Sequence, residues 1–207
     1  MRPLSYLLLL ALSFLFQGAP APKLFPIPDH MEFAFAGVTL SETNSKLLQT
    51  AFGADWQEDY FDAKKLASEQ VAMADISLGR LGNGVILKVN DEVLCGSGGC
   101  PLYAYVREKT GYRAVAKSFG WAYGVVATKS DVPDLAFASN GGGGKMNLLL
   151  QGYDGQHFVD KACETLTAKE GLPKSPNDWW DASKVSVAPC ENFEPPPPDE
   201  PASTTPR

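Results

Sequence analysis

The sequence lacks most of the signatures that mark an enzyme or a nucleic-acid-binding protein. Only two of its 207 residues are histidine, and the G-x-S-x-G, H-E-x-x-H, C-x-x-C and EF-hand motifs are all missing. The chain has 18 basic against 24 acidic side chains, whereas binding to phosphates favours a basic excess. We therefore name no catalytic residue, and we expect no cofactor, no metal and no nucleic-acid partner.

Long apolar runs are missing after residue 21, where no segment approaches the roughly 18 continuous apolar residues of a transmembrane helix. The longer run Leu4–Phe16 follows Arg2 and precedes Ala19-Pro20-Ala21. Its 13 residues are too few to cross a bilayer core of about 30 Å, and the small-x-small triplet is typical of a signal-peptidase site. Residues 1–21 are thus predicted to be a signal peptide, with an uncleaved anchor as the alternative, and the protein is expected to be periplasmic or secreted.

Four cysteines are enough for two disulfides, which suit an exported protein. Of the three possible pairings, the spacing favours Cys95–Cys100 and Cys163–Cys190, because the residues between the first pair are mostly glycine. The loop-entropy model assigns about 2 kcal/mol to the smaller ring and about 3.5 kcal/mol to the larger one. Zinc binding is the less favoured alternative, since only the first pair has the C-x₂₋₄-C spacing of structural zinc sites.

The remaining pattern predicts a mainly β fold of the α+β kind. Short apolar stretches recur about every 8–12 residues between glycine-marked turns, as in an antiparallel sheet, a sandwich or a partial-propeller-like sheet. Residues 79–84 are predicted to turn the chain, and Asn83-Gly84 within them is a hairpin signal, because both residues tolerate positive φ. A strand within 31–40 and an N-terminal helical segment within 41–53 and 62–70 are also predicted. The other predicted strands are residues 71–76, 85–89, 102–107, 112–117, 123–127, 134–138, 145–150, 157–159 and 185–187.

Proline content divides the chain beyond the signal peptide into three parts. Residues 22–30 form a proline-rich lead-in, residues 31–190 a single disulfide-stapled domain, and residues 191–207 a proline-rich acidic tail. Because the tail has almost no apolar residue to offset the entropy lost on ordering, it is predicted to be disordered.

Two segments resemble catalytic or phosphate-binding elements. Asn140–Lys145 lacks the first glycine and the final Ser or Thr of a P-loop, so the segment is predicted to be a hairpin turn. His157 lies between Asp154 and Asp160, and a His–Asp pair can act as a general base. No nucleophile follows at a recognisable spacing, so we favour a hairpin histidine.

Aromatic residues supply the candidate binding site. Trp179-Trp180 is the best candidate for an exposed patch, because adjacent residues on a loop seldom both point inward. Tyr103 and Tyr105 follow the Cys95–Cys100 loop directly and are further candidates. Such rings stack on sugars or anchor a protein partner.

Two motifs carry a family resemblance. Cys95–Tyr105 reads C-G-S-G-G-C-P-L-Y-A-Y, and Tyr153–Phe158 reads Y-D-G-Q-H-F. With these motifs, residues 75–163 resemble uncharacterised exported bacterial proteins that carry a C-G-x-G-x-C-P β-module and are distantly FG-GAP/VCBS-like. The calcium loop of such proteins corresponds to Asp75–Gly84, which keeps the turn glycines but lacks most acidic ligands. The resemblance implies export, a β fold and a hairpin without the metal.

We therefore predict a non-catalytic binding or interaction module for an envelope protein or glycan, with inhibition as one mode of action. The contacts would come from the Cys95–Cys100 loop and Trp179-Trp180, since a disulfide-fixed loop loses little entropy on association. Two alternatives remain. One is a hydrolase of envelope polymers that uses carboxylates and His157, and the other is a structural envelope domain tethered by its proline-rich tail.

Overall fold

The computed structural model describes residues 31, 36–37, 71–90, 92, 94–191 and 193–194. The predicted signal peptide, the lead-in, the helical segments within 41–53 and 62–70, and the tail beyond residue 194 lie outside these residues. The described chain is mainly β, with two short 3₁₀ helices, η3 (Gly79–Leu81) and η4 (Pro176–Trp180). In this part of the chain, no helix is long and apolar enough to cross a membrane.

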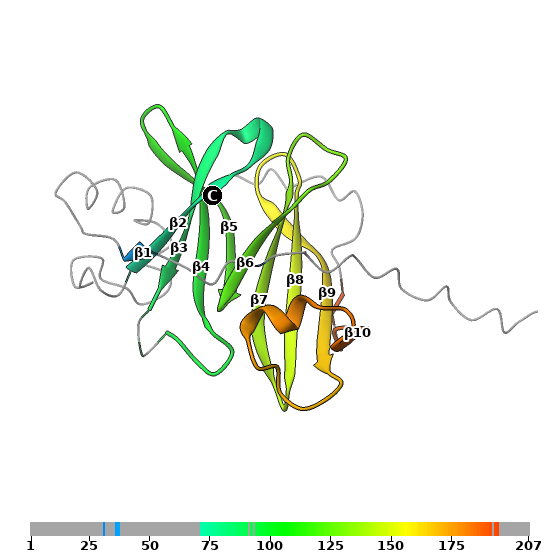
Figure 1. The fold of residues 1–207 in the computed structure, drawn as a ribbon. Helices are drawn as coiled ribbons and strands as arrows, with labels where there is room; N and C mark the ends of the chain where they lie inside the picture. The colour runs from blue at the N-terminus through cyan, green and yellow to red at the C-terminus, as the bar shows by residue number, and fades with distance from the viewer. Residues whose placement is uncertain are drawn as a thin grey trace, which may run out of the picture.

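In the described residues, ten strands form two antiparallel sheets (Figure 1). Within each sheet, neighbouring strands are also consecutive in sequence, whereas β5 and β6 follow each other in the chain without pairing. The first sheet contains β1 (Ala36–Gly37), β2 (Val71–Ser77), β3 (Asn83–Val89), β4 (Cys100–Glu108) and β5 (Gly111–Gly120). The second sheet contains β6 (Ala122–Val126), β7 (Asp134–Gly142), β8 (Lys145–Tyr153), β9 (Phe158–Ala168) and β10 (Val185–Pro189).

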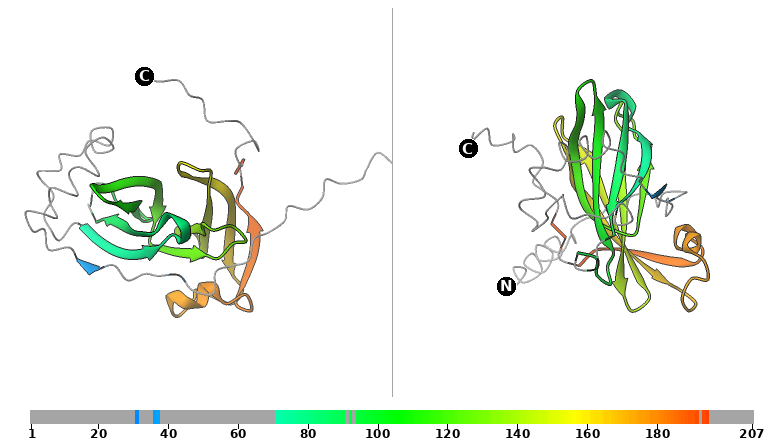
Figure 2. Two further views of the ribbon diagram at one scale, coloured as in Figure 1. Left: turned by 90° about the horizontal axis from the view of Figure 1, so that it is seen from above. Right: turned by 90° about the vertical axis from the view of Figure 1, so that its left-hand side faces the viewer.

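The two sheets meet where β5 passes into β6. Trp121 separates the two strands, and its backbone N–H donates to the Ala138 carbonyl of β7 at 2.7 Å. A Cβ atom on Gly120 would lie 2.3 Å from that same carbonyl oxygen, so the crossing requires glycine. The chain thereby changes sheet, and side chains of both sheets meet in one apolar cluster between them (Figure 2).

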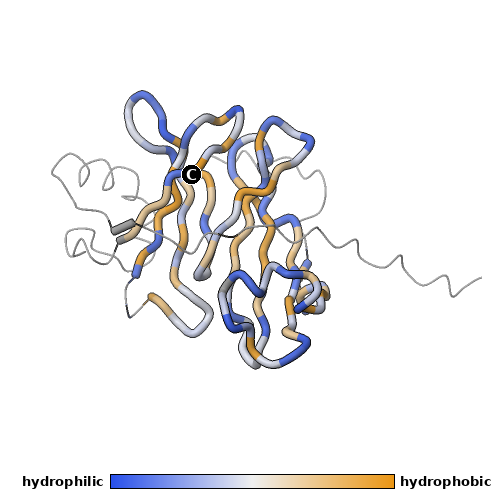
Figure 3. Tube along the Cα trace, viewed as in Figure 1, coloured by the Kyte–Doolittle hydropathy of each residue, from blue (hydrophilic) through white to orange (hydrophobic). Residues whose placement is uncertain are grey.

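Apolar side chains fill the space between the sheets and also cover the far face of the second sheet. Leu102 and Ile86 of the first sheet pack in one cluster with Leu135 and Phe137 of the second sheet. A second cluster lies on the opposite face of the second sheet, where Trp180 of η4 joins strand residues. Figure 3 shows the hydrophobic residues along the strands and the hydrophilic residues in the turns. Successive side chains of a strand point to opposite faces. Leu135 and Phe137 of β7 therefore belong to the first cluster, and Ala136 and Ala138 belong to the second.

The structure confirms the mainly β prediction and corrects two of its details. The predicted strand at residues 157–159 is in fact the first part of β9, which runs to Ala168. Charged residues make this strand hard to recognise in the sequence, because they interrupt its apolar pattern. The hairpin predicted at residues 79–84 is present, but its turn ends at Gly82, and Asn83 and Gly84 already belong to β3. Gly84 is needed because a Cβ there would lie 2.3 Å from the Tyr105 carbonyl oxygen of β4.

Both disulfides have the pairing that the sequence favoured. Cys95–Cys100 closes a tight turn ahead of β4, and Cys163–Cys190 joins β9 to the residue that follows β10. The backbone N–H of Cys190 also donates to the Cys163 carbonyl at 3.0 Å. The second disulfide thus fixes the end of β10 against β9.

Candidate binding groove

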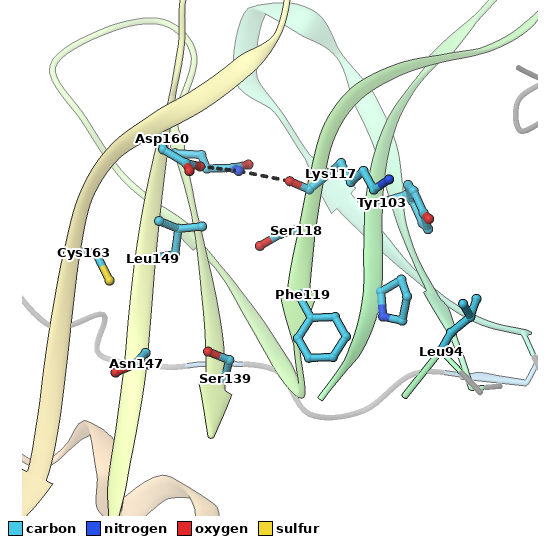
Figure 4. A pocket seen from close by; sticks show the side chains of 12 residues that line it. Leu94, Tyr103, Lys117, Ser118, Phe119, Ser139, Asn147, Leu149, Asp160 and Cys163 are labelled. Atoms are coloured by element: carbon cyan, nitrogen blue, oxygen red, sulfur yellow. Dashed lines mark hydrogen bonds between the residues drawn. The ribbon is translucent and has the colours of Figure 1, made fainter. Parts of the chain in front are cut away.

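A groove of about 750 Å³ lies between β5 and the inner face of the second sheet (Figure 4). We use inner face for the side of the second sheet that bears Leu135 and Phe137 and packs on the first sheet. The first sheet and the loop before it contribute Leu94, Pro101, Tyr103, Lys117, Ser118 and Phe119. The second sheet contributes Ser139, Asn147, Leu149, Gln151, Asp160 and Cys163.

The floor of the groove continues the inner face of the second sheet. In the ladder between β7 and β8, Phe137 pairs with Leu149, and in the next ladder Leu149 pairs with Cys163. Paired residues of an antiparallel ladder share a face, so Leu149 and Cys163 lie on the same side as the buried Phe137. Leu149 and Cys163 are only partly buried. The core surface therefore extends beyond β5 and stays open there.

The wall of the groove is the edge of β5, the last strand of the first sheet in the described part of the chain. The Lys117 carbonyl accepts a hydrogen bond from Gln151 Nε2 at 3.1 Å, and the Trp121 N–H bonds to β7. Both backbone groups therefore point away from β4. Alternate residues of an antiparallel strand direct their backbone groups to the same side, so the N–H and C=O of Phe119 also point into the groove. Pro101 is the residue opposite Phe119 on β4. Because proline has no N–H, it cannot donate a backbone hydrogen bond to Phe119.

Gln151 is the most deeply buried polar side chain of the groove, at 4% exposure. Its amide nitrogen donates to the Lys117 carbonyl and to Asp160 Oδ1, at 3.1 and 2.8 Å. Two acceptors at the nitrogen fix the orientation of the amide. Among the described residues, Gln151 Oε1 and the neighbouring Ser118 Oγ have no hydrogen-bond partner. A buried polar atom without a partner costs about 1–3 kcal/mol, so these two oxygens favour a ligand that donates hydrogen bonds.

The Cys95–Cys100 loop closes one end of the groove. Gly96 and Gly99 exchange backbone hydrogen bonds of 2.8 and 3.1 Å across the loop. The Gly98 carbonyl accepts a bond from the Asn140 N–H at 3.0 Å, and a Cβ on Gly98 would lie 3.2 Å from the Phe119 ring. The disulfide-fixed loop is thus packed against the end of β7 and the ring of Phe119.

The predicted binding residues occupy different positions in the structure. Tyr103 lines the groove, with Lys117 Nζ 5.7 Å from its ring centroid, whereas Tyr105 is only 1% exposed. The prediction of an exposed tryptophan pair is wrong for Trp180, which is 8% exposed and belongs to the second cluster. Trp179 is partly buried against the same cluster. Because η4 folds back onto the second sheet, both rings pack toward it.

The sequence reasoning missed the residues that form the groove itself. Phe119 is 41% exposed and Gln151 is buried, and neither lies in a motif. The available signal was the aromatic residue next to Gly120 at the end of a strand, where glycine often marks a close backbone approach. This strand edge lies beside the floor because residues that are far apart in sequence pack together.

The other sequence candidates lie outside the groove. His157 is exposed in the turn before β9, where its backbone N–H donates to Asp154 Oδ1 at 2.8 Å. Backbone hydrogen bonds from His157 and then from Gln156 lower the pKa of Asp154. The glycine run after Asn140 forms the turn between β7 and β8, as predicted. In the described chain, no group of three or more His, Cys, Asp or Glu side chains is placed to hold a metal ion.

The hairpin that replaces a calcium loop in the resemblance is present as β2, η3 and β3. Its carboxylate Asp75 forms an ion pair with Arg107 at 2.8 Å. Comparisons with models of protein families, with curated proteins and with solved structures found no match. The resemblance to exported bacterial proteins stays a prediction.

Proposed function

We propose that the protein is a non-catalytic binding module that holds an extended polypeptide segment of a partner in this groove. One observation carries the proposal: the outward backbone groups of β5 lie beside an open part of the inner face. The Lys117 carbonyl and the Trp121 N–H are already bonded within the protein, so an extended segment placed along β5 would form backbone hydrogen bonds chiefly with the outward N–H and C=O of Phe119. Its alternate side chains would reach the floor formed by β8 and β9.

The spacing of packed sheets suits an extended strand in the groove. Packed sheets lie about 10 Å apart, and neighbouring strands about 4.8 Å. One strand beside β5 would therefore cover the exposed floor at the normal distance between sheets.

The groove is less suited to a glycan. Sugar rings bind against exposed faces of aromatic side chains. Tyr103 is 7% exposed, which leaves Phe119 as the exposed ring among the groove residues. The remaining groove residues offer backbone groups, apolar atoms and several polar side chains, a mixture that matches a polypeptide.

The cellular location follows from the disulfides. Disulfides form and persist in oxidising compartments, and the structure has two of them. They are consistent with a periplasmic or extracellular location, so we propose a partner in the cell envelope or the surrounding medium.

A displayed library of random dodecapeptides, selected on the full-length disulfide-bonded protein, tests the proposal. We expect enriched peptides whose affinity falls when single backbone nitrogens are methylated, with sensitivity at every second residue. This period arises because only alternate N–H groups of a paired strand face the partner strand. Selection that yields no binder, or binders without this period, would overturn the proposal.

A protein variant provides the reciprocal test. Phe119→Pro removes the N–H that points into the groove and leaves the ladder to β4 unchanged, as proline permits at a strand edge. We expect peptide affinity to fall about tenfold, since an unmatched backbone group costs about 1–3 kcal/mol. Phe119→Ala is the matched control, because it removes the same exposed ring and keeps the backbone N–H. The methylated peptides make the test independent of any effect of proline on folding.

A further inference from the structure

We infer that the groove selects a segment with a basic side chain, a lysine or an arginine, which binds at Gln151, Asp160 and Ser118. The inference depends on the proposed function, because it names the chemistry of the segment that the groove holds. Two observations support it: the register of β5, and the acceptor oxygens of Gln151, Asp160 and Ser118 in the groove.

The register decides which side chains of the bound segment reach this site. Lys117 and Tyr103 are paired, and the Lys117 ammonium lies over the Tyr103 ring on the outer side of the first sheet. Successive side chains alternate, so Ser118 points to the floor. Figure 4 shows Ser118 directed into the space between β5 and β8. The residue of the bound segment opposite Ser118, and those two positions away, therefore point to the floor as well.

Oxygen atoms dominate the site that these side chains meet. Gln151 uses both N–H groups of its amide on the Lys117 carbonyl and Asp160, which leaves Oε1 to accept. Asp160 is exposed and is the only carboxylate among the groove residues. Ser118 Oγ is buried without a partner in the described chain and can also accept. A cationic donor satisfies all three groups, whereas an apolar or acidic side chain leaves Gln151 Oε1 unpaired.

The nearby lysines of the protein are directed elsewhere. Lys161 follows Asp160 in the chain, but its Nζ is 2.7 Å from Asp134 Oδ2. Lys117 lies over Tyr103. The chain also carries 24 acidic against 18 basic residues, so its field attracts a basic segment. Charge complementarity therefore favours a basic side chain both at the site and over the whole molecule.

The probes are the peptides enriched from the dodecapeptide library and their analogues with lysine or arginine replaced by norleucine, which has no charge. We expect the enriched peptides to contain a basic residue. Its side chain should lie on the same face of the extended peptide as the other residues that point to the floor, which are separated from it by an even number of positions. Norleucine should weaken binding about tenfold, because hydrogen bonds from charged donors are about twice as strong as neutral ones.

Asp160→Asn should reduce that tenfold preference to less than about threefold, by removing the carboxylate while keeping an oxygen acceptor. Asp131→Asn is the matched control: it makes the same change in net charge at an exposed residue of the loop between β6 and β7. Equal effects of the two variants would show a general effect of net charge and overturn the inference.

The outcomes separate the inference from the proposed function. Peptides with the alternating methylation pattern but without a basic residue would overturn the inference and support the groove as a polypeptide site. Peptides without that pattern would overturn both. Peptides with the pattern, a basic residue and a preference that depends on Asp160 would support both.

Discussion

Removal of each disulfide should destabilise the protein to a different extent, and the difference can be calculated from the loops that they close. Cys163–Cys190 spans 27 residues of sequence and Cys95–Cys100 spans 5. A crosslink lowers the entropy of the unfolded chain in proportion to the logarithm of the loop length, which gives about 3.5 and about 2 kcal/mol. We therefore expect the Cys163→Ala/Cys190→Ala variant to lose about 1.5 kcal/mol more than the Cys95→Ala/Cys100→Ala variant.

The structure adds a local consequence to this difference. The longer loop contains η4 and β10, and Cys190 lies immediately beyond β10. Without the crosslink, the five residues of β10 keep only their ladder to β9. We expect amide protons of β10 to exchange faster in the Cys163→Ala/Cys190→Ala variant, whereas those of β4 stay protected.

Urea unfolding of the two double variants and the oxidised wild type measures the free energies of unfolding. Hydrogen exchange on the same samples reports the local effect. An equal or greater loss of stability in the Cys95→Ala/Cys100→Ala variant would refute the loop argument. Unchanged exchange in β10 would refute the assignment of the larger crosslink to this strand.

Two further predictions concern a close contact and a charged turn. Gly120→Ala should lower the free energy of unfolding by about 1–3 kcal/mol, because the added methyl group collides with the β7 backbone. Gly96→Ala, where nothing lies within 4 Å of the added Cβ, should have almost no effect in the same urea experiment. The hydrogen bond from Lys184 lowers the pKa of Asp178, so the contribution of this carboxylate to stability is present above its unfolded pKa. That contribution is lost as the pH falls through the folded pKa. Asp178→Asn should therefore flatten the acid dependence of amide exchange at Ser175, whose N–H donates to the carboxylate. A dependence as steep as in the wild type would contradict this assignment.

The strands could largely be predicted from local sequence, and the exceptions have identifiable causes. β3, β4 and β7 contain short, nearly continuous apolar runs with glycines nearby in the sequence, so their pattern is visible without a structure. β9 was recognised only at its start, because Asp160, Lys161 and Glu164 interrupt its apolar pattern. Lys161 finds a partner in Asp134, which is 27 positions away in sequence, and no local rule identifies such a partner.

The binding residues were harder to predict than the strands. Tyr103, one of the predicted binding residues, lines the groove, but the tryptophans of η4 are packed against the second sheet. Whether an aromatic ring is exposed depends on what covers it, and η4 is covered by strands from the middle of the chain. Phe119 is exposed for the opposite reason, since its strand lies at the edge of the sheet.

The sequence alone determined the mainly β character and the cysteine pairing, because short apolar runs, glycine turns and cysteine spacing act over a few tens of residues. Only the tertiary structure decided that the chain changes sheet at Gly120 and leaves part of the second sheet uncovered beside β5. It also brought Gln151 to the Lys117 carbonyl, over 34 positions of sequence. The groove arises from this long-range packing of two sheets, whose relative position no local segment encodes.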